Sequence, residues 1–203
     1  MGRGSMILSL LAVFVLVPVH AFAECTYSLG DDGVTVHWRA FKLASKAPVN
    51  GSFGATSLEG PRTANSWPAL AKGLSMKIRG KSVDSGNPAR DVTLATFFFG
   101  FVKEDGDIKG RVTRVEGDDR RGTVEIAVTL NGQTREIPFA YTIAEDGTVN
   151  AKASIDMLAF GMQEAHDQIN QACRVQHTGE DGVSKTWTDV DLELRGKLET
   201  SCS

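Results

Sequence analysis

Apolar residues recur at every second position along most of this chain. In the first such run, residues 34–40, Val36 and Trp38 alternate with Thr35, His37 and Arg39. The same alternation continues in further runs, which cover residues 74–78, 124–130, 137–143, 149–155 and 190–194. Strict alternation indicates antiparallel strands with one face in the core and the other in water. The pattern therefore predicts an all-β protein.

Turn-forming residues separate these runs. Asn131-Gly132 lies between two of them and is a strong signal for a tight hairpin. Residues 105–106, 117–119 and 145–147 are rich in Asp and Gly and predict further turns. No shift in composition marks a second domain. We therefore expect one antiparallel meander of about eight strands, either a closed up-and-down barrel or a sandwich.

Two segments depart from the alternation and predict helices. Asn87 is a good N-cap and Pro88 suits the first helical position, so a short helix is expected over residues 88–96, after the third strand region. A second helix is expected before the last strand, because the small or apolar residues within 165–173 recur at helical spacing. Gly179 is expected to stop this helix or to end the loop beyond it.

The N-terminal residues have the composition of a cleaved signal peptide. Arg3 precedes an apolar run over residues 6–19, and Ala21-Phe22-Ala23 fits a small-x-small cleavage pattern. The apolar run is too short to span a bilayer, so stable membrane insertion is not expected. Glu24 stands before Cys25, where a lipoprotein would carry a small residue. These observations predict a signal peptide at 1–23, a mature domain at 24–203 and a periplasmic location.

Charge and cysteine content narrow the classes of function. The chain has 22 basic and 25 acidic residues and no basic cluster, which disfavours nucleic-acid binding. In an exported barrel with an even strand count, the first and last strands are neighbours, which favours a bond between Cys25, before the first strand, and Cys202, after the last. A Cys25–Cys173 bond remains the competing option if the second helix lies along the barrel wall.

Signals for catalysis are few. The histidines beyond the signal segment, His37, His166 and His177, show no metal-ligand spacing, and no nucleophile elbow, phosphate loop or dinucleotide fingerprint is present. His166-Asp167 and His177 with Glu180 and Asp181 are the only imidazole–carboxylate neighbours. The strand phase places His37 outside the barrel. The sequence therefore indicates a protein that is not an enzyme and needs no cofactor.

Three stretches together resemble the YceI-like family. They are "VTVHWRAFK" (34–42), "VNGSF" (49–53) and "KSVDSGNPARDVTL" (81–94), the last followed by the phenylalanine cluster Phe97, Phe98, Phe99 and Phe101. The resemblance implies an exported, lipocalin-like barrel that holds a long isoprenoid or fatty-acyl chain, with no catalytic residues to transfer. The chain departs from the family at Lys42, where His is usual, and in residues 170–187, to which the sequence assigns no chemical role.

A lipid cavity requires small or apolar inner walls and aromatic groups near its ends. Modest residues on the expected inner faces, such as Ala40 and Ala151, leave room for a ligand in a barrel of about eight strands. The candidate lipid-binding residues are Val36, Trp38, Phe41, Phe53, Met76, Ile78, Leu94, Phe97, Phe98, Phe99, Phe101 and Ile126. Lys42 and Arg90 are candidates for a polar head group. Alternatively, Arg90 and Asp91 only fix the start of the helix.

Three functions remain in view. The first is a periplasmic carrier for an isoprenoid, a quinone-like lipid, a fatty acid or an amide. The second is a lipid-modifying enzyme in the same barrel, with a histidine and a carboxylate as acid and base. The third is a stress-related interaction module with a filled core and residues 170–187 as its partner surface. The sequence does not fix the oligomeric state and leaves a homodimer open.

Overall fold

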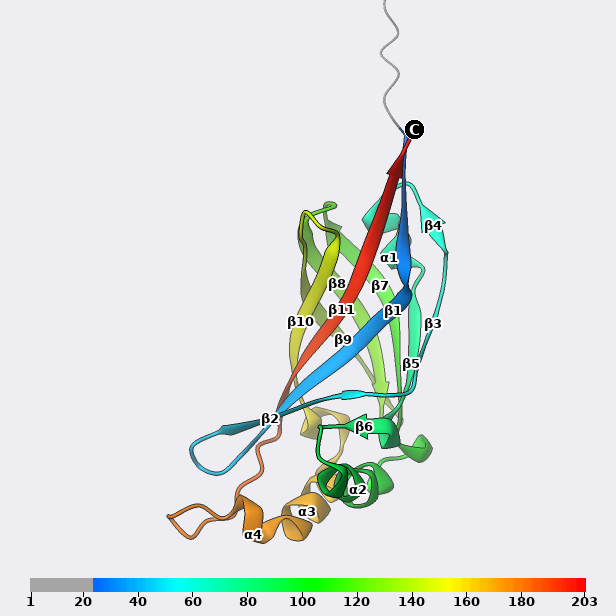
Figure 1. The fold of residues 1–203 in the computed structure, drawn as a ribbon. Coiled ribbons are helices and arrows are strands. Elements are labelled where there is room, and N and C mark those ends of the chain that lie inside the picture. Colours follow the sequence, from blue (N-terminus) through cyan, green and yellow to red (C-terminus); the bar gives the residue numbers. More distant parts are fainter. Residues whose placement is uncertain (1–23) are drawn as a thin grey trace, which may run out of the picture.

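Long antiparallel strands wrap around a common axis and enclose the core (Figure 1). The structure is a computed structural model that describes residues 24–203, with the side chains of residues 31 and 32 left aside. The predicted signal peptide at 1–23 lies outside the described residues. The strands are β1 (Cys25–Lys42), β2 (Ala47–Phe53), β3 (Thr56–Glu59), β4 (Thr63–Ala64), β5 (Ser75–Arg79), β6 (Val83–Asp84), β7 (Asp107–Gly117), β8 (Arg121–Leu130), β9 (Gln133–Ile143), β10 (Thr148–Asp156) and β11 (Asp189–Cys202).

Helices lie at both ends of the strands. They are α1 (Trp67–Lys72), α2 (Pro88–Phe97), α3 (Gln163–Ala172) and α4 (Arg174–His177), with 3-10 turns η1 (Gly80–Ser82), η2 (Phe99–Phe101), η3 (Glu104–Gly106) and η4 (Met157–Phe160). Figure 1 shows α2, α3 and α4 together below the strands, at what we call the helical end. Helix α1 lies nearer the opposite end, where the chain finishes.

The sheet closes on itself. Hydrogen bonding follows the order β3-β5-β7-β8-β9-β10-β11-β1-β2-β6. The two ends of this path meet because β2 runs on into β3, while β5 runs on through η1 into β6. The Gly54 amide donates to the Ser82 carbonyl at 2.8 Å, and the Arg79 amide donates to the Ala55 carbonyl at 3.0 Å. Going round the barrel, the strands are β1, β2–β3, β5–β6, β7, β8, β9, β10 and β11, which confirms the predicted barrel.

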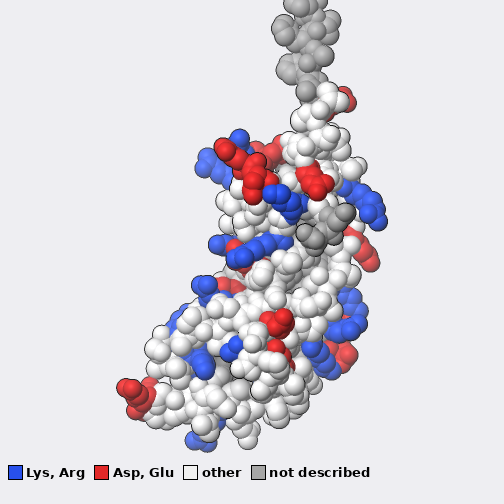
Figure 2. Space-filling model, in the orientation of Figure 1, with Lys and Arg blue, Asp and Glu red and all other residues white. Residues whose placement is uncertain are grey.

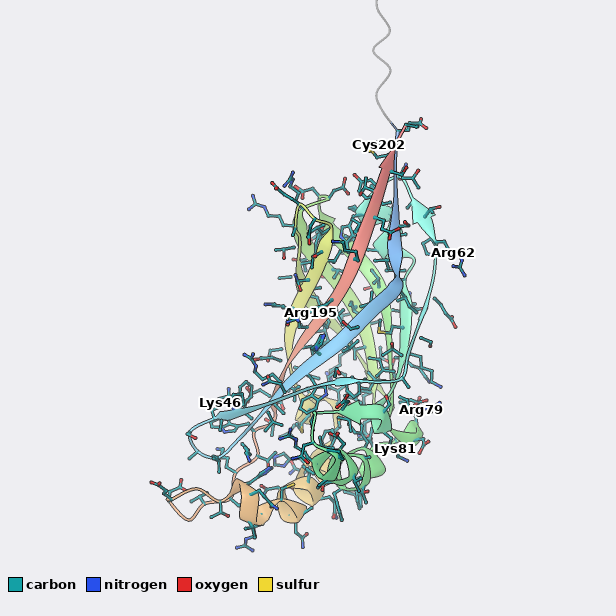
Figure 3. The ribbon with its side chains drawn as sticks, in the orientation of Figure 1. Lys46, Arg62, Arg79, Lys81, Arg195 and Cys202 are labelled. Atoms are coloured by element: carbon teal, nitrogen blue, oxygen red, sulfur yellow. A yellow bond between two sulfur atoms is a disulfide. The ribbon has the colours of Figure 1, made fainter. Side chains whose placement is uncertain are left out.

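The pairing of β1 with β11 confirms the predicted closure. Its register runs from Cys25 opposite Cys202 to Arg39 opposite Asp191. Cys25 and Cys202 form a disulfide, while Cys173 carries a free thiol at the helical end. Figure 3 shows Cys202 at the tip of the barrel that lies away from α2, α3 and α4, and we call this the disulfide end.

Helix α2 has the predicted start. The Asn87 side chain accepts a hydrogen bond from the Arg90 amide at 3.1 Å, and Pro88 occupies the first turn. Helix α3 also agrees with its predicted stripe, since Ala165 and Ile169 are buried. Gly179 caps neither helix. Its amide bonds to the Val183 carbonyl at 3.2 Å, which closes a tight turn in the loop after α4.

Helix α1 is an element that the alternation does not predict. Ser66 caps its start, and the Trp67 amide donates to Asp119 at 2.9 Å. The Tyr27 hydroxyl donates to the other carboxylate oxygen of Asp119 at 3.0 Å, so one aspartate from the β7–β8 turn ties α1 to β1. Trp67 and Leu70 are buried and fill the disulfide end of the barrel.

Gly51 allows a tryptophan to lie across β2. It stands opposite Trp38 in the β1–β2 register, and a Cβ at this position would overlap the Trp38 ring and the Asp84 carbonyl. We expect Gly51→Ala to push Trp38 inward and to lower the free energy of unfolding by about 1–3 kcal/mol, the usual cost of overpacking. Urea unfolding measures this loss. Gly54→Ala is the control, because its Cβ would meet nothing closer than 3.6 Å.

Candidate functional site

The barrel encloses a cavity of about 560 Å³ with walls that are almost entirely apolar. This volume lies within the range of small-molecule sites, about 300–1,000 Å³. The wall is made of inward-facing side chains from the strands. Residues of α1, of α2 and of the segment 169–187 complete it. The residues on the strands include Val34, Val36, Ala40, Val49, Ile108, Val112, Val124, Val128, Phe139, Val149, Ala151, Val190, Leu192 and Leu194.

Residual accessibility inside the barrel shows that the centre is not filled. Leu192 and Leu194 point inward from β11, opposite Trp38 and Val36 of β1, and yet both are only partly buried. A core residue touching neighbours on all sides would keep almost no accessible surface. The exposed parts of these leucines face the cavity. The structure therefore does not contain the filled core that the interaction-module hypothesis requires.

The cavity is closed by α1 at the disulfide end and opens at the helical end. Trp67 lies edge-on to Tyr141, with their ring centroids 5.8 Å apart. Its indole N–H is the one buried side-chain donor without a hydrogen-bond partner in residues 24–203. At the helical end, Asn87, Ala89 and Gln176 line the cavity and are exposed to solvent, which places an opening between α2 and α4.

Most of the candidate lipid-binding residues meet at this cavity. Those that line it are Val36, Trp38, Phe41, Phe53, Met76, Ile78, Leu94, Phe98, Phe99 and Ile126. Phe41 comes from the other phase of β1 and reaches the wall near the helical end, under the Lys46 ammonium at 4.8 Å from its ring centroid. Phe97 and Phe101 lie outside the cavity wall, 41% and 39% exposed.

The phenylalanine cluster divides because helix α2 ends within it. Phe99 is buried in an edge-on stack, 5.9 Å from Phe53 and 5.0 Å from Phe98 between ring centroids. Its ring packs against Gly80, where a Cβ would overlap Phe99 itself. Phe98 and Phe99 thus form the cavity wall beside α2, so two of the four phenylalanines at 97–101 serve as wall residues.

Arg90 has the helix-fixing role that the sequence offered as an alternative. Its Nε donates to the Ser85 hydroxyl at 2.7 Å and its Nη2 donates to the Ser85 carbonyl at 2.9 Å. Asp91 in turn accepts from the Ser85 amide at 2.9 Å. Arg90 also borders the cavity, but these bonds hold its guanidinium on the loop before α2.

A group of polar side chains from distant parts of the chain lies at the helical end of the cavity. This mouth cluster consists of Lys42, Asn170, His177 and Thr186. Residues 185–187 run beside the end of β1, where the Leu43 amide donates to the Lys185 carbonyl at 2.9 Å. Lys42 and Thr186 form a β-bridge, and both line the cavity with His177. Residues 170–187, which the interaction-module hypothesis used as a partner surface, therefore build one side of the mouth.

The mouth holds His177 in its neutral form. Burial of the ring and, to a smaller extent, the positive charge of Lys42 lower the pKa of His177 from 6.5 to about 4. When the pKa of a histidine is lower in the folded than in the unfolded protein, its contribution to stability is complete above the unfolded-state pKa. This contribution is lost as the pH falls toward the folded-state pKa. We expect an NMR titration to give a pKa of about 4 for this imidazole.

The same shift predicts an acid-sensitive stability. The free energy of unfolding should fall as the pH decreases from 6.5 to 4, because only the unfolded chain gains a proton on His177 in this window. Urea unfolding at several pH values measures the slope. His177→Gln should flatten the curve, and an unchanged slope in this variant would contradict the assignment.

An acid–base pair for catalysis is not assembled in the cavity. His177 faces it, but no aspartate or glutamate is among the described lining residues. His166 contacts Asp167 at 3.3 Å outside, and His37 contacts Thr35 on the outer face of β1. Residues 24–203 contain no group of three or more metal-ligating side chains. No helix in this part of the chain is long and apolar enough to cross a membrane.

The outer surface carries charges of both signs. Figure 2 shows basic and acidic side chains interspersed over this face, without a large region of one sign. Figure 3 shows Lys46 beside the helical end, and its ammonium pairs with Asp189 at 2.6 Å. Surface electrostatics therefore give no sign of a polyanionic partner on this face.

Comparison with known proteins gives a consistent result. The model of the YceI-like domain matches residues 27–197. Among solved structures, Burkholderia cenocepacia BcnA is 17% identical over 84% of this chain and 99% of its own, with a TM-score of 0.60. A polyisoprenoid binding domain from Saccharophagus degradans, implicated in plant cell wall breakdown, is 12% identical over 86% and 98%, also at 0.60. The Campylobacter jejuni YCEI protein is 21% identical over 76% and 85%, at 0.51. A search of curated proteins found no match.

Proposed function

Because the chain belongs to the YceI-like family, we propose that it is a periplasmic carrier that holds a long apolar lipid inside its barrel. The ligand would be an isoprenoid, a quinone-like lipid, a fatty acid or an amide. The observation that supports this most strongly is the enclosed cavity of about 560 Å³, walled by aliphatic and aromatic side chains. The polyisoprenoid-binding description of the similar Saccharophagus domain agrees with it.

The free energy gained by burying the lipid in such a site is of the same order as the cost of binding it. Burying one methylene contributes about 0.8 kcal/mol, so a chain of about fifteen carbons gains roughly 12 kcal/mol. Association and ordering of the ligand cost about 4–15 kcal/mol. Micromolar binding corresponds to about −8 kcal/mol, so apolar contact alone reaches it only if the cost lies near the lower limit, and otherwise a head-group contact is needed.

The proposal assigns binding to the cavity wall. Trp38, Phe53, Phe98 and Phe99 would contact the chain at the helical half, while residues such as Val36, Met76, Ile78 and Ile126 would contact it further in. Cleavage after Ala23 during export would leave residues 24–203 as one lipid-binding domain. The Cys25–Cys202 disulfide suits an oxidising compartment such as the periplasm.

Titration of delipidated protein with prenyl alcohols of increasing length tests this function. Trp38, Trp67 and Trp187 all line the cavity, so the intrinsic tryptophan fluorescence reports occupancy. We expect a single saturable site with an affinity that rises with chain length until the cavity is full. The absence of saturable binding for every prenyl and acyl chain offered would refute the carrier.

A further inference from the structure

Lys42 ends the row of inward-facing residues on β1. Val36, Trp38 and Ala40 precede it in the same phase, so its side chain enters the helical end of the cavity. Its ammonium donates one long hydrogen bond, 3.4 Å, to the Gln176 carbonyl. Two of its three N–H donors remain for a ligand.

The charge of Lys42 is not neutralised by its neighbours. It makes no ion pair with the described side chains, whereas nearby Lys46 is paired with Asp189. The Cys173 thiol also lines this end, and burial raises its pKa, so it contributes no negative charge. A ligand oxygen can therefore reach an ammonium group that has no competing anion among these neighbours.

The hydrogen bonds around His177 fix which of its nitrogens carries the proton. The Thr186 hydroxyl donates to the Asn170 side-chain oxygen at 2.9 Å. Thr186 must then accept at its 2.7 Å contact with His177 Nδ1, so Nδ1 carries the hydrogen. In a neutral ring this leaves Nε2 as an acceptor, and no described group hydrogen-bonds to it.

We propose that Lys42 and His177 form a head-group subsite that selects a lipid with a hydroxyl head, such as a prenyl alcohol or a prenyl phenol. The hydroxyl oxygen accepts from Lys42 Nζ while its hydrogen is donated to His177 Nε2. An ether or a hydrocarbon leaves Nε2 without a donor. A carboxylate or a phosphate brings negative charge against the lone pair of Nε2, and Lys42 alone balances it. This inference rests on the proposed carrier function.

Competition between matched prenyl lipids tests the subsite. Geranylgeraniol, its methyl ether and geranylgeranoic acid share one chain and differ only in the head group. For the wild-type protein at neutral pH, we expect the alcohol to bind roughly tenfold tighter than the ether, the effect of one well-made buried hydrogen bond. We also expect the alcohol to bind tighter than the acid.

Substitution of His177 should remove the preference and not the binding. His177→Phe should bring the alcohol and the ether to within about twofold of each other. Lys42→Met removes a donor that both lipids use, so it should weaken both and leave the alcohol preferred over the ether. Thr186→Val keeps Lys42 and His177 but removes the hydroxyl that holds the hydrogen on His177 Nδ1. It should therefore reduce the preference for the alcohol over the ether, and it provides a second test if His177→Phe folds poorly. Lys72→Met, on the exposed side of α1, removes one lysine away from the site and should keep the wild-type preference.

The outcomes separate this inference from the proposed function. Saturable binding of all three lipids with equal affinity would overturn the subsite and leave the carrier standing. Tightest binding of the acid would also overturn it. Failure of every probe to bind would refute the carrier itself.

Discussion

Ala40→Trp should weaken lipid binding strongly while leaving the barrel folded. Ala40 lines the cavity between Trp38 and Lys42, and it is only partly buried because its side chain borders the empty space. An indole there would occupy room that about three ligand methylenes need, which removes about 2.4 kcal/mol of binding free energy. This corresponds to an affinity roughly fiftyfold weaker in a prenyl alcohol titration.

The outer face of the same strand provides the control. Thr35 points away from the cavity and is exposed, so Thr35→Trp adds the same side chain to β1 without reducing the interior volume. Its affinity should equal that of the wild-type protein. Equal affinities for the Ala40 and Thr35 variants would mean that the ligand, if any, binds elsewhere.

Removing the disulfide should cause the largest loss of stability. Cys25 and Cys202 are 177 residues apart, so their bond closes almost the whole described chain into one loop. In the chain-entropy model, such a long loop stabilises the folded state by about 4–5 kcal/mol. The double variant Cys25→Ser, Cys202→Ser should lose stability of this order in urea unfolding, seen as a lower midpoint.

The third cysteine separates this effect from the loss of a thiol. Cys173 is free and partly buried at the helical end, so Cys173→Ser should change the unfolding midpoint little. Reducing agent should destabilise the wild-type and Cys173→Ser proteins alike and leave the double variant unchanged. A double variant as stable as the wild-type protein would show that the hydrogen-bonded β1–β11 pair holds the closure without the covalent bond.

The strands could be predicted because their information is local. Alternation in β8 and β9 and the Asn131-Gly132 pair between them specify a hairpin, and both turn residues have the positive φ angles that this turn requires. The Asn87-Pro88 start of α2 is local in the same way. The six-residue helix α1 was missed, because it has little internal periodicity and is held by Asp119 from a distant turn.

The mouth cluster could not be predicted from spacing. Lys42 and the chain around His177 meet across a sequence separation of 134, through pairing of residues 185–187 with the end of β1. The pattern near His177 suggested the carboxylates of Glu180 and Asp181 as partners. Asp181 instead accepts from the Val183 amide at 3.0 Å, which stabilises the turn and leaves His177 to Thr186. This geometry depends on the tight turn at Gly179, and the residues of that turn match no known functional motif.

The proposed function requires the barrel interior to be a lipid site and not a closed core. Native mass spectrometry of the protein, purified without denaturant from the cells that produce it, provides the test. We predict an added mass that disappears on extraction with organic solvent and returns when the extracted prenyl or acyl lipid is added back. Protein that is consistently free of ligand and takes up neither prenyl nor acyl lipids would contradict a lipid site in the barrel.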